Sequence, residues 1–194
     1  MAEYEHIVHP FAPIVTPAAR VLVLGSLPSK LSRENDFYYG NPRNRFWHVM
    51  AAVLDQPVPA DIPQKAKLLN EHGIALWDVI AECDIRGSSD ASIRNARPVD
   101  IARVRDVCPV RRRYFHGLSL VDIARVRDVC RLRTVFANGR TAERLFKHYL
   151  AQELPGIPFA CLPSTSPANA AWRLPQLERA WTQALAPYLK DPRA

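Results

Sequence analysis

Short apolar runs alternate along this chain with segments in which apolar residues recur at helical spacing. Each run is bounded by turn residues and has the length of a buried strand. Strands are predicted at 21–25, 74–80, 134–139 and 158–162. Helices are predicted from Asn44, in NRFWHVMAAVL, and at 63–72, 140–150 and 175–189. Because strands alternate with helices, we expect a mainly parallel sheet with helices on both faces, which is the α/β class.

The ends of the predicted strands carry polar residues that are typical of a binding site. Gly25 and Ser26 follow the first strand, and Pro163 and Ser164 follow the last. In open parallel sheets, ligands bind beyond the carboxyl ends of the strands. We therefore expect the functional site at that edge of the sheet.

A duplicated segment interrupts the alternation. The decapeptide VDIARVRDVC occurs at 99–108 and again at 121–130, and chance does not explain ten identities. The second copy leads into a predicted strand and helix, so we assign the first copy to an insertion at about 99–120 within a single domain spanning 1–194. The insertion is expected to add a helix and a strand beside the sheet or to extend it. Its RRRY run, 111–114, fits either a solvated basic face or a contact to phosphates.

Composition bears on the partner and on the compartment. The chain has 194 residues, 48% of them hydrophobic, which is enough for one core. Lys and Arg number 26 against 19 Asp and Glu, a formal charge of +7, so the chain is either simply basic or a binder of polyanions. It has no run of about 18 apolar residues, and MAEYEHIVHPF lacks a secretory leader, so we expect a cytoplasmic protein without a membrane segment. The four cysteines form no C-x-x-C pair, so we expect reduced thiols and no metal.

The stretch GSLPSKLSRENDFYYGNPRNRFW, residues 25–47, carries the strongest chemical signal. A buried strand that ends in Gly-Ser-x-Pro is followed by an aromatic pair and an Asn-rich turn. Such a sequence predicts a pocket for a flat polar ring, and a nucleobase is the ring that this chemistry favours.

Five spaced motifs resemble a known family. GSLPS, YYGNPRNRFW, CDIRGSSDASI, FANG and LPSTSPAN resemble, in this order, the hypoxanthine-DNA glycosylase branch of the uracil-DNA glycosylase superfamily, and the turn NPRNRFW is also similar to that of the mismatch-specific uracil glycosylases. The resemblance implies a three-layer α/β/α sandwich with a central, mainly parallel four-stranded sheet. It implies a monofunctional DNA glycosylase without cofactor, which flips a deaminated base out of double-stranded DNA or takes it from single-stranded DNA and hydrolyses its N-glycosidic bond. We expect a monomer.

The resemblance assigns the catalytic role to Asn44. Superfamily members commonly orient water with an Asn or Asp in the first motif, where this chain has Leu27. A carboxamide accepts a hydrogen bond from water or a base N–H and donates one to a carbonyl oxygen. From the residues alone, Asn44 also fits an N-cap of the following helix, and both roles are compatible.

Base-binding residues are expected around the same turn. Tyr39 resembles the aromatic residue that stacks on the flipped base, whereas one of Phe37, Tyr38 and Tyr39 must belong to the core. The other expected base-binding residues are Gly25, Ser26 and Leu27, through backbone N–H groups, and Asn138. Gly40 lacks a side chain beside Tyr39, which favours acceptance of a purine such as hypoxanthine.

The remaining motifs are expected to contact DNA. DNA-binding residues are predicted at Ser29, Arg43, Ser164, Thr165, Ser166 and Asn169. Since Ala168 and Asn169 are small, Trp172 or Arg173 is a candidate for the wedge that fills the emptied base stack; a buried Trp172 is the alternative. In CDIRGSSDASI, the polar residues resemble a loop near the base pocket, or they form a plain Gly-Ser turn. They are Arg86, Ser88, Asp90 and Ser92.

Two other functions remain open at this point. A nucleic-acid-binding relative without catalysis would explain the missing first-motif Asn and the duplication. A hydrolase of free nucleosides would share the pocket chemistry but would leave the basic surface without a task.

Overall fold

A computed structural model describes residues 3–87, 90–107 and 132–189. Its centre is a four-stranded parallel sheet with the strand order β3-β2-β6-β7. The strands are β2 (Val21–Gly25), β3 (Ile74–Asp78), β6 (Thr134–Asn138) and β7 (Phe159–Leu162). These four strands confirm the four that the apolar runs predict. Each residue of β2 and β3 is buried because helices cover both faces of the sheet.

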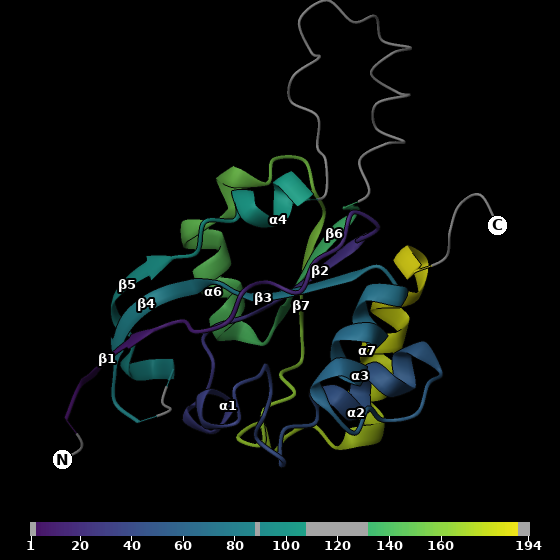
Figure 1. The fold of residues 1–194 in the computed structure, drawn as a ribbon, viewed down its shortest axis with the longest axis horizontal. Helices are drawn as coiled ribbons and strands as arrows, with labels where there is room; N and C mark the ends of the chain where they lie inside the picture. The colour runs from purple at the N-terminus through teal and green to yellow at the C-terminus, as the bar shows by residue number, and fades with distance from the viewer. Residues whose placement is uncertain (1–2, 88–89, 108–131, 190–194) are drawn as a thin grey trace, which may run out of the picture.

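Helices flank the sheet on both sides (Figure 1). One group consists of α2 (Phe46–Leu54), α3 (Ile62–Glu71) and α7 (Leu174–Leu189). The other consists of α4 (Ala102–Val107) and α6 (Arg140–Tyr149). The predicted α/β class and three-layer sandwich are thereby confirmed. None of the helices that the structure describes has the length and apolar character that a bilayer crossing needs.

Shorter helical turns occupy the loops beside the sheet. They are α1 (Lys30–Glu34) and the 3-10 turns η1 (Asp90–Ser92) and η3 (Ala151–Glu153). Of these, α1 and η1 lie near the carboxyl edge of the sheet; α1 follows the first sequence motif, and η1 lies within the third.

A second, antiparallel sheet has the order β1-β4-β5 and was not predicted. Its strands are β1 (Glu5–Val8), β4 (Ile80–Ile85) and β5 (Arg94–Pro98). The predicted strand 74–80 in fact ends at Asp78, and β4 begins two residues later in the other sheet. The charged strand β5 has little burial, so the sequence offered no apolar run to indicate it.

The hydrophobic core joins both sheets and the helices in one cluster. Trp181 on α7 is fully buried, packs edge-on against Phe46 of α2, and donates its indole N–H to the carbonyl oxygen of Pro163 at 3.0 Å. The final helix is thus tied both to α2 and to the segment that follows β7.

The duplicated segment is only partly described. In the first copy Val99, Ile101 and Val104 are buried in the core, and α4 begins at Ala102. Residues 108–131, with the RRRY run and the second copy, lie outside the described residues. Which copy is the insertion, and whether 1–194 forms a single domain, therefore stay predictions.

Replacement of Asp61, the N-cap residue of α3, tests how much this cap stabilises the fold. Asp61 accepts the backbone N–H of Gln64 at 2.8 Å, and the Gln64 side chain accepts the N–H of Ala60 at 3.0 Å. We expect Asp61→Ala to lower the free energy of unfolding by about 1 kcal/mol, because it leaves a first-turn N–H without its acceptor. Urea unfolding measures this loss. Asp61→Asn, which keeps the acceptor, is the control, and equal losses in the two variants would contradict the capping role.

Candidate active site

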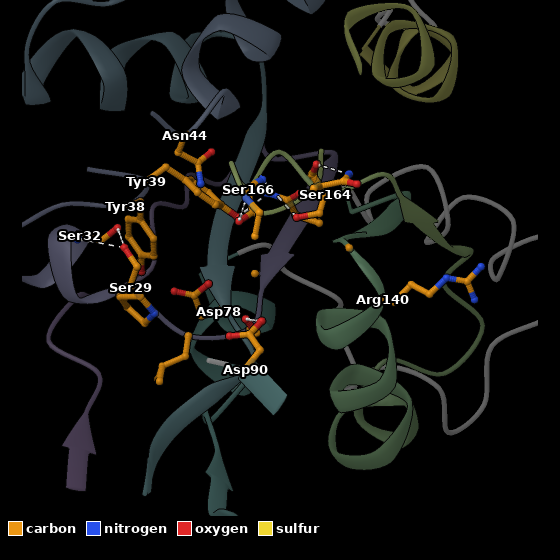
Figure 2. A pocket seen from close by; sticks show the side chains of 18 of the residues that line it. Ser29, Ser32, Tyr38, Tyr39, Asn44, Asp78, Asp90, Arg140, Ser164 and Ser166 are labelled. Carbon is orange, nitrogen blue, oxygen red and sulfur yellow. Dashed lines mark hydrogen bonds between the residues drawn. The ribbon is translucent and has the colours of Figure 1, made fainter. Parts of the chain in front are cut away.

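A cavity of about 960 Å³ opens at the carboxyl edge of the parallel sheet (Figure 2). The last residues of all four strands line it. They are Gly25, Asp78, Asn138 and Leu162. The edge predicted from sequence is therefore where the cavity lies, because parallel strands direct all their carboxyl ends to the same side.

Most of the predicted site residues come together in this cavity. Those that line it are Gly25, Ser26, Leu27, Ser29, Tyr39, Asn44, Asn138, Ser164, Ser166 and Asn169. Arg43 is exposed and lies outside the cavity lining. Thr165 was predicted to contact DNA, and this is wrong: its side chain is 0% exposed and its hydroxyl bonds inside the wall.

Tyr39 stands in an unusual conformation at the cavity. Its φ of 52° lies in the left-handed region, which a non-glycine residue adopts only when its surroundings hold it there. One face of the ring stacks on Phe46, with centroids 4.0 Å apart and an interplanar angle of 19°. A base would therefore have to stack on the other face. Burial raises the pKa of Tyr39 well above its ordinary value, so the phenol stays neutral.

The neighbouring aromatics are not in the same position. Tyr38 is 2% exposed and donates its hydroxyl to the carbonyl oxygen of Ala12 at 3.0 Å. The expectation that one aromatic of this trio belongs to the core is confirmed. Gly40 does not line the cavity; a side chain there would press on Asn35 and the Phe37 carbonyl. The expectation that Gly40 makes room for a purine is therefore wrong, because that glycine serves the packing of the turn.

A hydrogen-bonded bracket joins three motifs behind the cavity wall. The Asn138 amide nitrogen donates to the Tyr39 hydroxyl at 3.0 Å and to the Thr165 hydroxyl at 2.9 Å. Its amide oxygen accepts the Thr165 backbone N–H at 2.9 Å. Both amide protons of Asn138 are thereby used, so this residue holds Tyr39 and the last motif in place.

Asn44 completes the bracket and also binds the first residue of α2. Its amide oxygen accepts the Thr165 hydroxyl and the Phe46 backbone N–H, each at 3.0 Å. The N-cap of α2 is Arg45, which makes no side-chain cap bond, so the predicted N-cap role of Asn44 is wrong; its oxygen binds the helix from one residue earlier, and both lone pairs are used. The amide nitrogen lies on the cavity side in Figure 2. Asn44 is therefore placed to donate a hydrogen bond into the cavity, and its catalytic role stays a prediction.

Arg45 binds the loop that carries the last motif. Its guanidinium donates to the carbonyl oxygens of Thr165 at 3.3 Å, Ser166 at 2.5 Å and Asn169 at 3.1 Å, and also to that of Trp172. A planar group with five donors satisfies several carbonyls at once, which a lysine ammonium does not do. Sequence reasoning missed this role, because nothing in NPRNRFW indicates what its second Arg contacts.

A buried Asp-His pair, of which Asp78 lines the cavity floor, was also missed. Asp78 accepts the Nε2 proton of His9 at 2.9 Å, and the two side chains are 6% and 3% exposed. Because His9 Nδ1 accepts the backbone N–H of Phe11 at 3.1 Å, the imidazole is neutral with its proton on Nε2. A side chain on Gly25 would meet the other carboxylate oxygen of Asp78. The one available signal was a lone carboxylate at the end of IALWD.

The third motif contributes a second carboxylate. Asp90 lines the cavity and accepts the Ser26 hydroxyl at 2.8 Å. Burial raises the pKa of Asp90, and the nearby Asp78 charge raises it further. Arg86 is exposed and lies over the ring of Tyr4, and Ser92 closes the loop onto the Arg86 N–H. This motif is therefore more than a plain turn, although Ser88 lies outside the described residues.

Trp172 lies at the edge of the cavity. It is 37% exposed, so the alternative of a buried core residue is wrong. An exposed indole beside a cavity is compatible with the predicted wedge.

Comparison with known proteins agrees with this arrangement. Residues 12–189 match the family described as the Uracil DNA glycosylase superfamily. The chain belongs to the uracil DNA glycosylase superfamily. A solution NMR structure of another candidate uracil DNA glycosylase, from Methanosarcina acetivorans, shares the fold with a TM-score of 0.65 and 26% identity over 91% of this chain and 98% of that one.

Two curated relatives carry the name Hypoxanthine DNA glycosylase. The protein of Methanosarcina acetivorans is 31% identical over 103 residues, which cover 53% of this chain and 65% of the relative. That of Methanosarcina barkeri is 27% identical over 100 residues, which cover 51% and 63%. The matched region thus spans less than two thirds of the length of these superfamily members.

Replacement of Arg45 tests the bracket of the last motif. We expect Arg45→Lys to speed amide hydrogen exchange in residues 164–172, because one ammonium cannot satisfy the four carbonyls that the guanidinium now holds. Hydrogen-exchange mass spectrometry measures this. Arg179→Lys on the exposed side of α7 is the matched control. Unchanged protection of the loop in Arg45→Lys would show that other contacts hold it.

Proposed function

We propose that this superfamily member is a monofunctional DNA glycosylase that hydrolyses the N-glycosidic bond of hypoxanthine or uracil in DNA. The observation that carries the proposal is the cavity itself. Tyr39 presents a ring to stack on, and no described residue accepts a hydrogen bond from the Asn44 amide nitrogen. Opposite them, the floor carries a buried acceptor, Asp78. The names of the curated relatives support the same chemistry.

The Asp78 carboxylate supports a preference for deaminated bases. Hypoxanthine and uracil each carry a ring N–H beside a carbonyl, whereas adenine and cytosine carry a ring nitrogen lone pair at the corresponding position. An ionised carboxylate only accepts hydrogen bonds, so it attracts the first pattern and repels the second. His9 holds one carboxylate oxygen, and the other faces Gly25 at the cavity. A donor for the adjacent carbonyl is available from Asn44 or from backbone N–H groups at Ser26 and Leu27.

The side chains that line the cavity support direct hydrolysis by water, without a covalent Schiff-base intermediate. The described side chains around the cavity offer carboxylates, amides and hydroxyls, and no lysine amine is among them. A Schiff-base mechanism with strand cleavage would need such an amine. The abasic product is therefore expected to keep its strand intact until it is treated with alkali.

The cavity rim supports a flipped nucleotide as the substrate. Ser164 and Ser166 line one wall of the cavity, and Trp172 lies at its edge. Arg43, the residue before Asn44, is exposed. With a formal charge of +7, the chain attracts the phosphate backbone. Extrusion of a base costs a few kcal/mol and least at a mispair, so lesions opposite a wrong partner are preferred. The cytoplasmic location and the monomeric state stay predictions.

The activity is tested with oligonucleotides that carry a single deoxyinosine or deoxyuridine. We expect alkali-labile sites at the lesion with the wild-type chain in single- and double-stranded DNA, and intact strands without alkali. Gel electrophoresis of labelled strands measures the product. Undamaged duplexes are the control, and intact strands for both lesions after alkali would contradict the proposal.

The variant Asn44→Ala separates an enzyme from a mere binder. An enzyme loses cleavage while keeping its affinity for lesion DNA, whereas for a binding protein neither wild type nor variant cleaves. Thermal unfolding checks that the loss of the Asn44 bonds to Thr165 and Phe46 leaves the fold intact.

Replacement of Asp78 tests base selection. We expect Asp78→Asn to lower kcat/KM on hypoxanthine by about 10- to 100-fold, the range that loss of one hydrogen bond to a charged group implies. The carboxamide also offers a donor, so the selectivity for hypoxanthine over adenine falls. Steady-state rates on both bases measure the ratio. An unchanged ratio would exclude Asp78 from base recognition.

A further inference from the structure

We infer that Asp90 is the general base that takes a proton from the attacking water, and that Ser26 is the residue that positions it. This inference rests on the proposed glycosylase function and assigns the step that the first motif leaves without a residue.

Water activation needs an acceptor, and neither the first-motif position nor Asn44 supplies one. Leu27 has no polar side-chain atom. The amide oxygen of Asn44 already accepts from Thr165 and Phe46. Asn44 can hold a water by donation from its nitrogen, but it cannot draw a proton from that water.

Of the three described carboxylates that line the cavity, one is suited to be the general base. Glu143 stands at the rim and accepts the Lys147 ammonium at 2.7 Å, and this contact lowers its pKa. Asp78 is 4% exposed on the floor and gives one oxygen to His9, which suits recognition of the base edge. Asp90 is half-buried on η1, nearer to solvent than Asp78.

The geometry of Asp90 leaves one oxygen for water. Its Oδ2 accepts the Ser26 hydroxyl at 2.8 Å, and none of the described residues donates to Oδ1. Figure 2 shows the carboxylates of Asp90 and Asp78 facing the cavity from the side opposite Asn44. A nucleotide between these walls would have a donor on one side and the Asp90 acceptor on the other.

The electrostatic surroundings make Asp90 a stronger base than an ordinary aspartate. Burial raises the pKa of Asp90, and the Asp78 charge adds to the rise, whereas the Ser26 bond and Arg144 on α6 oppose it. The Asp90 charge is also felt by Tyr39 and Cys83, and burial raises the pKa of both, so they bring no charge. A carboxylate with a raised pKa accepts a proton more readily in the transition state.

The reaction step balances as follows. The water oxygen forms a bond to the sugar C1′ while the bond from C1′ to the base nitrogen breaks, and that electron pair leaves with the base. One water proton passes to Asp90, and the other stays on the new C1′ hydroxyl. Asp90 then returns its proton to solvent or to the departing base anion. Before this transfer, its negative charge also stabilises the oxocarbenium-like sugar.

The test is a single-turnover rate on deoxyinosine DNA. We expect Asp90→Asn to slow cleavage by about 10²- to 10⁴-fold, the contribution typical of a general base, while affinity for lesion DNA stays unchanged. In the wild type the rate falls as the pH drops through the raised pKa of Asp90, because the base must be ionised; Asp90→Asn loses this dependence. Ser26→Ala still shows the fall in rate at low pH, but its rate is lower at every pH because Asp90 is less well positioned. Asp55→Asn, at an exposed left-handed position that Asn tolerates, is the matched control.

Chemical rescue separates catalysis from folding. Added formate restores part of the rate to Asp90→Ala, because the small carboxylate occupies the vacated space, and it does not speed the wild type. Wild-type rates in Asp90→Asn, or a lack of rescue in a variant that still binds lesion DNA, would overturn the inference. An inactive wild type would instead overturn the proposed glycosylase function.

Discussion

The Arg45 guanidinium is the contact on which the cavity wall depends. The segment after β7 has no regular structure, so its carbonyl oxygens need partners from elsewhere in the chain. Arg45 supplies them for Thr165, Ser166, Asn169 and Trp172. The adjacent residue, Asn44, binds the Thr165 hydroxyl. Two consecutive residues just before α2 therefore hold a loop more than a hundred positions away, and Tyr39, Ser164 and Ser166 keep their relative positions.

The charges in the cavity are divided between its walls. Carboxylates stand on the floor, each held by a neutral donor, His9 for Asp78 and Ser26 for Asp90. Amide donors stand on the opposite wall. A negative group beside the sugar favours the cationic transition state, whereas one beside the departing base opposes its negative charge. If the cavity holds a base as proposed, Asp78 selects the base edge and the donors face the base carbonyl.

Much of the parallel framework was readable in the sequence, because buried strands are continuous apolar runs and each helix shows its period. The antiparallel sheet was not readable: β5 is mostly exposed and charged, and β4 follows β3 so closely that one run covers the end of one and the start of the next. The motifs gave the location of the site and most of its lining. They did not give Asp78, which sits in an apolar run, or His9, which comes from the first residues of the chain.

The sequence by itself determined the elements of the parallel framework, the edge of the sheet where the site lies, and the family, since period, turn residues and motif order are local properties. The tertiary structure alone decided what each polar atom does. Thr165 proved to be a buried link, the oxygen of Asn44 proved to be occupied, and Gly40 proved to serve a turn. Hydrogen-bond capacity is finite, and which partners use it depends on residues brought together from distant parts of the chain.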